Sequence, residues 1–191
     1  ASPAQDPSSQ GRRAQGCDES CCDVGPGSAS LSTSARTRPT ALVTGASSGI
    51  GEALATCLAE AGHNLVLVAR SEVRLRRLAA ALAAAHGVKA WVASADLAVP
   101  GAAARLAASM KRAKRTIDVL VNNAGVLEHG AFVDMPATRH QQLIDLNVAG
   151  LTAMLAHFVP PMVARGHGRI LNVASIAAVQ PVPSLATEAA T

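Results

Sequence analysis

The sequence predicts an α/β fold built on a doubly wound parallel sheet of about five strands. From residue 39 onward, short apolar runs alternate with longer amphipathic or alanine-rich stretches. This alternation of strand and helix signals is typical of parallel sheets with helices on both faces. In addition, three glycines, Gly45, Gly49 and Gly51, stand where the first apolar run gives way to a helix pattern. Residues 39–191 are therefore predicted to form one folded domain.

Residues 1–38 are predicted to be a disordered tail outside this domain. The tail is rich in Ser, Pro, Gly, Gln and Arg and holds almost no large apolar side chains. Burial there cannot offset the entropy that is lost when a chain becomes ordered. Its four arginines balance its four acidic residues, so the whole net charge of +4 belongs to the remainder of the chain.

The first three elements of the domain form a β-α-β unit. The apolar run 41–43 is the first strand, and a helix follows from Gly49 to a stop at Gly62. Apolar residues recur in this helix at the spacing of a buried stripe. We expect that stripe to consist of Ile50, Ala53, Leu54, Cys57, Leu58 and Ala61. The continuous apolar run 64–69 then suits a parallel strand that is covered on both faces.

The later elements continue the alternation. Residues 72–85 are predicted as a helix, 89–96 as a strand and 117–121 as a further strand. The long helix at about 137–158 is expected to end before Pro160-Pro161, and 169–173 is the fifth strand. An alanine-rich helix opened by Pro100 and Gly101 ends in basic residues. We interpret this cluster as a solvated helix end, since cations are favoured there: Lys111, Arg112, Lys114 and Arg115.

The glycine turn after the first strand predicts a phosphate cradle. Glycines allow positive φ and close backbone approach, so main-chain amides and the helix N-terminus can face a pyrophosphate. A strand-to-helix turn with chance glycines is the alternative, and the complete β-α-β unit favours the cradle. No Gly-Lys-Ser/Thr occurs in the turn, which argues against the phosphate loop of nucleotide triphosphatases. A dinucleotide is the predicted ligand.

Composition argues against other classes of partner. The modest positive charge suits a phosphorylated cofactor, but two Phe, one Trp and no Tyr leave little for base stacking, so no nucleic acid is expected. No apolar run reaches membrane-spanning length by this reading, so no membrane is expected and a cytoplasmic location is predicted. No metal site is expected, because Cys17, Cys21 and Cys22 have no nearby histidine as a fourth ligand.

Four well-separated segments together resemble the short-chain dehydrogenase/reductase family, classical type. They are Thr-Gly-Ala-Ser-Ser-Gly-Ile-Gly at 44–51, Asn-Asn-Ala-Gly at 122–125, Leu-Asn-Val-Ala-Gly at 146–150 and Asn-Val-Ala-Ser at 172–175. The resemblance covers residue 39 to the end and implies a Rossmann-type, NAD(P)-binding domain. It also implies that the family continues past residue 191, so the domain is expected to be incomplete, with the fifth strand as an edge. The apolar face of the long helix is then expected to be exposed; it carries Leu143, Leu146, Leu151, Leu155 and Phe158.

The resemblance implies a set of cofactor-binding residues. The first segment would surround the phosphates through Thr44, Gly45, Ser47, Ser48, Gly49, Ile50 and Gly51. Asp96 and Leu97 would meet the adenine. Asn123, Ala124 and Gly125 would line the adenosine ribose and the approach to the nicotinamide. For Asn122 and Asn123, a strand-end turn that bonds its own backbone is the alternative, and the two roles can coexist.

Arg70 favours NADP(H) over NAD(H). It follows the second strand, where an acidic residue would grip the 2′-hydroxyl of NAD and a cation would meet the 2′-phosphate of NADP. The acid is missing, and Ser47 and Ser48 could add neutral donors. A solvated arginine at the start of the next helix is the alternative.

The resemblance also implies the chemistry, a hydride transfer between the nicotinamide and a carbonyl or alcohol substrate. Ser175 matches the family's serine, which hydrogen-bonds the reacting oxygen of the substrate. Asn147 matches the family's helix asparagine, which helps to hold a water molecule that relays protons. Each residue also has a local alternative role: Ser175 could cap the element that follows it, and Asn147 could form a hydrogen bond within its own helix. The family's catalytic Tyr would fall at position 188, which is Glu188, and its Lys would follow Thr191, outside the sequence.

Three hypotheses follow from this departure. The chain represents an NADP(H)-dependent oxidoreductase that is catalytically impaired, a dinucleotide-binding pseudoenzyme, or an interaction module. An ionised glutamate has no proton to give to a carbonyl oxygen, which underlies the expected impairment. Homo-oligomers are implied for a full-length relative and are doubtful for this chain.

Overall fold

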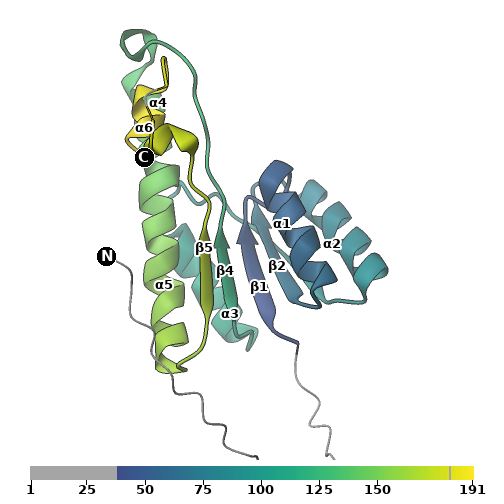
Figure 1. Ribbon diagram of the computed structural model, residues 1–191. Helices are drawn as coiled ribbons and strands as arrows, with labels where there is room; N and C mark the ends of the chain where they lie inside the picture. The colour runs from purple at the N-terminus through teal and green to yellow at the C-terminus, as the bar shows by residue number, and fades with distance from the viewer. Residues whose placement is uncertain (1–37, 181) are drawn as a thin grey trace, which may run out of the picture. The chain divides into compact units, whose positions relative to one another are not determined.

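The structure, a computed structural model, describes residues 38–180 and 182–191 (Figure 1). Its five strands pair in parallel in the order β3-β2-β1-β4-β5. They are β1 (Thr40–Thr44), β2 (Asn64–Ala69), β3 (Ala90–Ser94), β4 (Val119–Asn122) and β5 (Arg169–Asn172). The tail predicted for residues 1–38 lies outside the described residues except for Arg38, whose guanidinium donates to the Gly87 carbonyl at 2.9 Å.

Helices connect the strands in the predicted alternation. They are α1 (Gly49–Glu60), α2 (Glu72–His86), α3 (Ala102–Arg112), α4 (Ala137–Ile144), the π-helical turn η2 (Asp145–Gly150), α5 (Leu151–Ala164) and α6 (Ala186–Ala189). Two short 3-10 turns are η1 (Phe132–Asp134) and η3 (Ile176–Ala178). In Figure 1, α4 and α6 lie side by side beyond the carboxyl ends of β4 and β5, and they contact each other.

Alternate strand residues fill two cores, one on each face of the sheet. Leu42 and Leu120 belong to the core that includes residues of α3 and α5. Val43 and Leu65 belong to the other core, which includes residues of α1 and α2. Successive side chains of a strand point to opposite faces, so strands this apolar must be covered on both. The predicted doubly wound, Rossmann-type sheet is confirmed.

The buried face of α1 differs from the predicted stripe. The fully buried positions are Gly51, Ala55 and Ala59, whereas Cys57 is exposed and Ile50 is 62% exposed. A Cβ at Gly51 would overlap the Gly45 carbonyl, so this glycine must face the β1 loop. That contact rotates the helix away from the orientation that its larger apolar residues alone would favour.

The long helix extends beyond its predicted end. Pro160 and Pro161 lie inside α5, and the helical stretch 137–164 is continuous over 28 residues. A proline leaves the carbonyl four residues earlier without a helix donor. Here those carbonyls belong to the exposed Ala156 and His157, where water can satisfy them, so the helix is not forced to end.

The same stretch corrects the expectation that no apolar run reaches membrane-spanning length. By length and composition alone, the stretch 137–164 passes that test, because it contains an 18-residue window with a mean hydropathy of 1.4. A core helix passes it equally, but only 22% of that window is buried in this structure. The buried residues of α5 are Met154, Phe158 and Met162.

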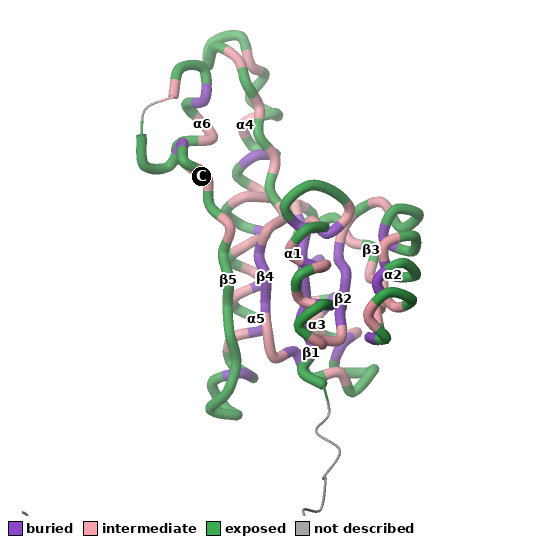
Figure 2. Tube along the Cα trace, turned by 45° about the vertical axis from the view of Figure 1, so that its right-hand side comes forward, coloured by how far each residue is buried: buried purple, intermediate pink, exposed green. Residues whose placement is uncertain are grey.

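β5 lies at the edge of the sheet, as the sequence analysis predicted for the fifth strand. Ile170 and Leu171 point to opposite faces, yet each is 44% exposed, and the tube of β5 is coloured as exposed in Figure 2. The expected exposure of the long helix is wrong for Leu143 and Phe158, which are 2% and 6% exposed. Leu146, Leu151 and Leu155 are half-buried. Phe158 packs in the core of the sheet, and the exposed large apolar residues of the stretch are instead Ile144, Val148 and Val163.

Candidate functional site

A cavity of about 350 Å³ opens at the carboxyl ends of the strands. Its walls come from the loops that follow β1, β2, β3 and β4. β1 and β4 are neighbours in the sheet, and the chain order reverses between them. Open parallel sheets bind ligands at such a switch point, so the cavity lies where the fold itself favours a ligand.

Nine of the thirteen predicted cofactor-binding residues line this cavity. They are Gly45, Ser47, Ser48, Arg70, Asp96, Leu97, Asn123, Ala124 and Gly125. The other four lie beside it: Thr44 is buried at the end of β1, while Gly49, Ile50 and Gly51 form the first turn of α1. Residues from four separate loops are therefore brought together.

Thr44 joins the β1 loop to the β4 loop. Its Oγ1 accepts hydrogen bonds from the amides of Asn123 and Ala124 at 2.9 and 3.0 Å and donates to the Val121 carbonyl at 3.2 Å. The side chain of Asn123 forms a further hydrogen bond between the same two loops, because its Nδ2 donates to the Thr44 carbonyl at 3.0 Å. Asn123 thus bridges two strands, which decides against the alternative of a bond to its own turn.

The conformation of the β1 loop explains why glycines stand there. Gly45 and Gly49 have φ of 65° and 58°, in the left-handed region that disfavours side chains. A Cβ on residue 45 would also lie 2.7 Å from Asn123 Nδ2, so this position is crowded as well. A Cβ on residue 49 would meet no atom within 4 Å. The loop is therefore packed against β4 at Gly45 and open at Gly49.

The amino end of α1 is available to an anion. Among the described residues, the side chain of Ser48, the N-cap residue of α1, makes no capping hydrogen bond. The first amides of a helix have no intrahelical acceptors, and they carry the positive end of the helix dipole. Together with the open glycine turn, this end fits a diphosphate group, which is the chemistry that a dinucleotide would require.

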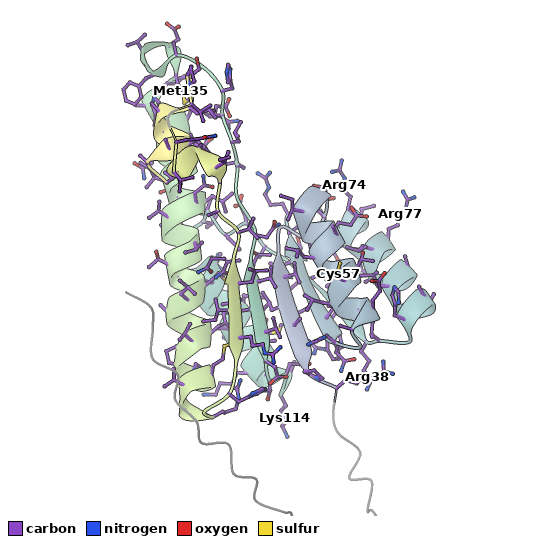
Figure 3. All side chains as sticks on the ribbon, viewed as in Figure 1. Arg38, Cys57, Arg74, Arg77, Lys114 and Met135 are labelled. Carbon is purple, nitrogen blue, oxygen red and sulfur yellow. The ribbon has the colours of Figure 1, made fainter. Side chains whose placement is uncertain are left out.

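The structure adds residues that the sequence reasoning missed. Arg74, Ser71, Val126 and Leu146 also line the cavity. Arg74 lies in α2 four residues after Arg70, and Figure 3 shows it on the upper end of that helix. Arg70 itself precedes the N-cap residue Ser71, so no helical spacing links the two arginines, and only the fold brings them to one cavity. Ser94 Oγ donates to the Arg70 carbonyl at 3.0 Å and so holds the backbone of this corner.

Asn147 lies in the π-helical turn η2 and holds the loop that follows β4. Its Oδ1 accepts from the Val126 amide at 3.0 Å, and its Nδ2 donates to the Val126 carbonyl at 3.1 Å and to Thr191 Oγ1 at 3.1 Å. π-helical turns are rare in proteins, and those that do occur are often found at functional sites. The asparagine therefore bonds across the fold, beyond the local helix bonds of the alternative interpretation.

Ser175 directly precedes η3, and its Oγ accepts from the Ala177 amide at 3.2 Å. This is the capping role of the alternative interpretation, and it leaves the hydroxyl proton available. α6, which carries Glu188, contacts η3. No hydrogen bond between described residues joins Ser175 to Asn147, and neither residue lines the 350 Å³ cavity.

Glu188 lies in α6 with one carboxylate oxygen isolated. Among the residues that the structure describes, its Oε2 is buried without a hydrogen-bond partner. Burial raises the pKa of the Glu188 carboxyl, because the charged form loses hydration. Neighbouring Thr187 is held by His140, whose Nδ1 lies 2.6 Å from Thr187 Oγ1.

The ionised Glu188 carboxylate should destabilise the folded state, and we expect Glu188→Gln to remove this destabilisation. Because the pKa of Glu188 is raised in the folded state, that state holds the proton more tightly than the unfolded chain. The Glu188 contribution to the free energy of unfolding therefore falls as pH rises from about 4.5 through the raised pKa. Urea unfolding at pH 4.5 and 7.5 should show the variant gaining stability relative to the original chain at the higher pH. An equal difference at both pH values would contradict this expectation.

Comparison with known proteins agrees with this geometry. The family model described as short chain dehydrogenase matches residues 39–191. The oxidoreductase UcpA of Escherichia coli (strain K12) is 40% identical over 143 residues, which are 73% of this chain and 52% of UcpA. The chain thus spans about half the length of this curated relative.

Solved structures show the same similarity. A short-chain dehydrogenase from Sphingobium yanoikuyae in complex with NADPH is 41% identical, with a TM-score of 0.75 over 80% of this chain and 59% of that chain. L-sorbose reductase from Gluconobacter frateurii, complexed with NADPH and L-sorbose, is 35% identical, with a TM-score of 0.75 over 81% and 60% of the two chains. The switch-point cavity, the glycine turn and these matches lead to one conclusion: the chain belongs to the short-chain dehydrogenase family of oxidoreductases.

Proposed function

We propose that this protein binds NADP(H) and serves the transfer of a hydride between the nicotinamide and a small carbonyl or alcohol substrate. The observation that carries the proposal is the uncapped amino end of α1 beside the open glycine turn, at the cavity of the switch point. That arrangement offers amide donors and a helix dipole to a diphosphate. The NADPH complexes of two similar proteins support the same ligand.

The preference for NADP(H) rests on the charge of the cavity wall. Arg70 and Arg74 both line the cavity, whereas Asp96 is the one acidic residue among its described lining residues. Asp96 is also engaged, since its Oδ1 accepts from the Ala98 amide at 3.0 Å. Guanidinium groups bind phosphate oxygens through charge-assisted hydrogen bonds, and Ser47 and Ser48 in the same wall add neutral donors.

The chain's own residues would position the reacting groups, and the bound nicotinamide would supply or accept the hydride. Ser175 would donate its free hydroxyl proton to the carbonyl oxygen of the substrate. Asn147, by clamping Val126, would keep the β4 loop in place beside the cofactor. Glu188 stands where the family places its Tyr. Its raised pKa widens the pH range over which this carboxyl keeps a proton that it can donate.

A second candidate function is dinucleotide binding without turnover. Glu188 favours it, because an ionised carboxylate accepts hydrogen bonds only and would repel a developing alkoxide. Saturable NADPH binding without NADPH oxidation across a panel of ketones and aldehydes would select this candidate. Oxidation with any member of the panel would select the first. The homo-oligomer and the cytoplasmic location stay predictions.

We expect Arg70→Asp to weaken NADPH binding and to spare NADH binding. The original chain should bind NADPH more tightly than NADH in a fluorescence titration. Arg70→Asp removes one charge-assisted phosphate contact, worth about 1.5–3 kcal/mol, so the dissociation constant for NADPH should rise roughly tenfold or more.

Arg77→Asp is the matched control for this experiment. Arg77 is exposed on α2, as Figure 3 shows, and it does not line the cavity, yet its replacement changes the net charge by the same amount. An equal loss of NADPH affinity in both variants would mean that only the general field matters. Absence of saturable binding of either dinucleotide by the folded chain would refute the proposed function itself.

A further inference from the structure

A second concave surface lies between α3 and α5, away from the dinucleotide cavity. These helices contact each other on the same face of the sheet. A groove of about 630 Å³ runs between their carboxyl-terminal halves. Its floor includes Met110, Ile117 and Phe158, which are 5%, 5% and 6% exposed. The apolar floor is therefore recessed below the surface.

The rim of this groove is basic. Lys111, Lys114, Arg115 and Arg165 line it, and no acidic residue does so in the described part of the chain. The sequence contains no Asp or Glu from residue 97 to 117 or from 146 to 187. Among residues 38–180 and 182–191, no ion pair involves any of the four cations. The sequence alone presented this cluster as a solvated helix end, because it did not show that α5 packs beside it.

Two of the cations are held in place by contacts within the fold. Arg165 Nη2 donates to the Ile117 carbonyl at 2.8 Å. The Arg115 guanidinium lies over the ring of Trp91, 4.4 Å from its centroid. A charge fixed in this way loses less conformational entropy when it binds an anion.

Lys114 adds a further cation to the rim, at the end of α3. It has φ of 52° at the end of α3, in the left-handed region where a glycine would be unstrained. The Lys114 and Arg115 amides donate to the carbonyls of Lys111 and Met110, both at 3.0 Å, which closes the helix. A lysine at this position carries a conformational cost and brings its charge to the rim. In Figure 3, Lys114 extends outward from the end of the fold nearest the carboxyl end of α3.

We propose that the α3/α5 groove binds a fatty acid, a single-chain amphiphile with a carboxylate head. The acyl chain would cover the recessed floor, where burial of each methylene is favourable. The carboxylate would meet the basic rim, which complements its charge. The volume lies within the range of small-molecule sites. An apolar surface that anchors a protein in a membrane must protrude, and this one does not.

Trp91 provides a direct reporter, because it is the chain's single Trp and contacts Arg115 of the rim. Titration with dodecanoate below its micellar concentration should change Trp91 fluorescence saturably. Raising the salt concentration should weaken the apparent affinity by screening the rim. Dodecan-1-ol should bind more weakly, and dodecyltrimethylammonium should not bind. Equal binding of the cationic amphiphile, or no saturable change with dodecanoate, would overturn the proposal.

Variants separate the groove from the general charge of α3. Lys111→Glu should weaken dodecanoate binding roughly fivefold or more, since it replaces a rim cation by a repelling charge. Arg112→Glu changes the net charge equally but lies outside the groove lining, and it should have little effect. Ala108→Phe places a ring at a lining position and should abolish binding, whereas Ala80→Phe on the exposed face of α2 should not.

Two further outcomes would identify a different occupant. Sedimentation that shows a dimer weakened by Ala108→Phe, with no effect of dodecanoate, would assign the groove to a second copy of the chain. Binding to phosphatidylglycerol vesicles without binding of free dodecanoate would assign it to a membrane surface. Either result would overturn the proposal.

Discussion

Replacement of Thr44 by valine should lower the free energy of unfolding by about 3 kcal/mol. The Thr44 side chain is buried, and its hydroxyl satisfies three backbone groups, the amides of Asn123 and Ala124 and the carbonyl of Val121. Valine keeps the shape and removes every one of these bonds. Each buried group left without a partner costs about 1–3 kcal/mol, offset in part where the loop relaxes toward water. Urea unfolding monitored by circular dichroism would measure the loss.

The same substitution should weaken NADPH binding, because Asn123 and Ala124 line the cavity and are held in place by Thr44. Thr44→Ser is the matched control, since serine retains the hydroxyl and loses only a methyl group. It should keep most of the stability and nearly all of the binding. If valine and serine were equally destabilising, packing of the methyl group rather than the hydrogen bonds would explain the role of Thr44.

The strands could be predicted closely from the sequence because burial on both faces leaves a continuous apolar run. The predicted strand 64–69 coincides with β2, and all of its central residues are fully buried. The parallel pairing followed from the alternation of strands with helices, because parallel strands need a crossover connection. The order β3-β2-β1-β4-β5 was not predicted and is given by the structure. The edge position of β5 followed from the family resemblance and was confirmed by the pairing.

Helix orientation and helix ends were predicted less well, since tertiary contacts decide them. The face of α1 is set by the fit of Gly51 against the Gly45 carbonyl, which a count of apolar residues does not reveal. The extent of α5 past Pro160 depends on whether the freed carbonyls reach water. Both features arise from neighbours that are distant in the sequence or from solvent.

The candidate site shows the same division. Motifs identified the loops, and the fold brought nine of the predicted residues to one cavity. The sequence did not indicate that Thr44 is an internal hydrogen-bonding centre, because a threonine at the end of a strand has no distinctive pattern. It also did not point to Arg74, whose place depends on the direction in which α2 leaves the sheet.

Gly51→Ala should cost about 3 kcal/mol of folding free energy and weaken NADPH binding about tenfold, the second large effect that the structure predicts. A Cβ at this position would lie 2.5 Å from Asn123 Nδ2 and 2.8 Å from the Gly45 carbonyl carbon, and it would overlap the Gly45 oxygen. Two of these three atoms belong to the backbone and cannot rotate aside. The amino end of α1 would have to move away from β1, and the adjoining residues Ser47 and Ser48, which line the cavity, would move with it.

Two other glycines separate this overlap from simpler effects of adding a methyl group. Gly130→Ala has no atom within 4 Å of the new Cβ and no positive φ, so it should change stability by less than about 0.5 kcal/mol. Gly49→Ala also meets no atom within 4 Å, but its φ of 58° strains the backbone, at a cost of about 1 kcal/mol. Urea unfolding of the three variants should therefore rank Gly51→Ala as the most destabilised and Gly130→Ala as the least. If Gly51→Ala unfolded no more easily than Gly49→Ala, the close contact between α1 and the Gly45 loop would not be the constraint that sets the cradle.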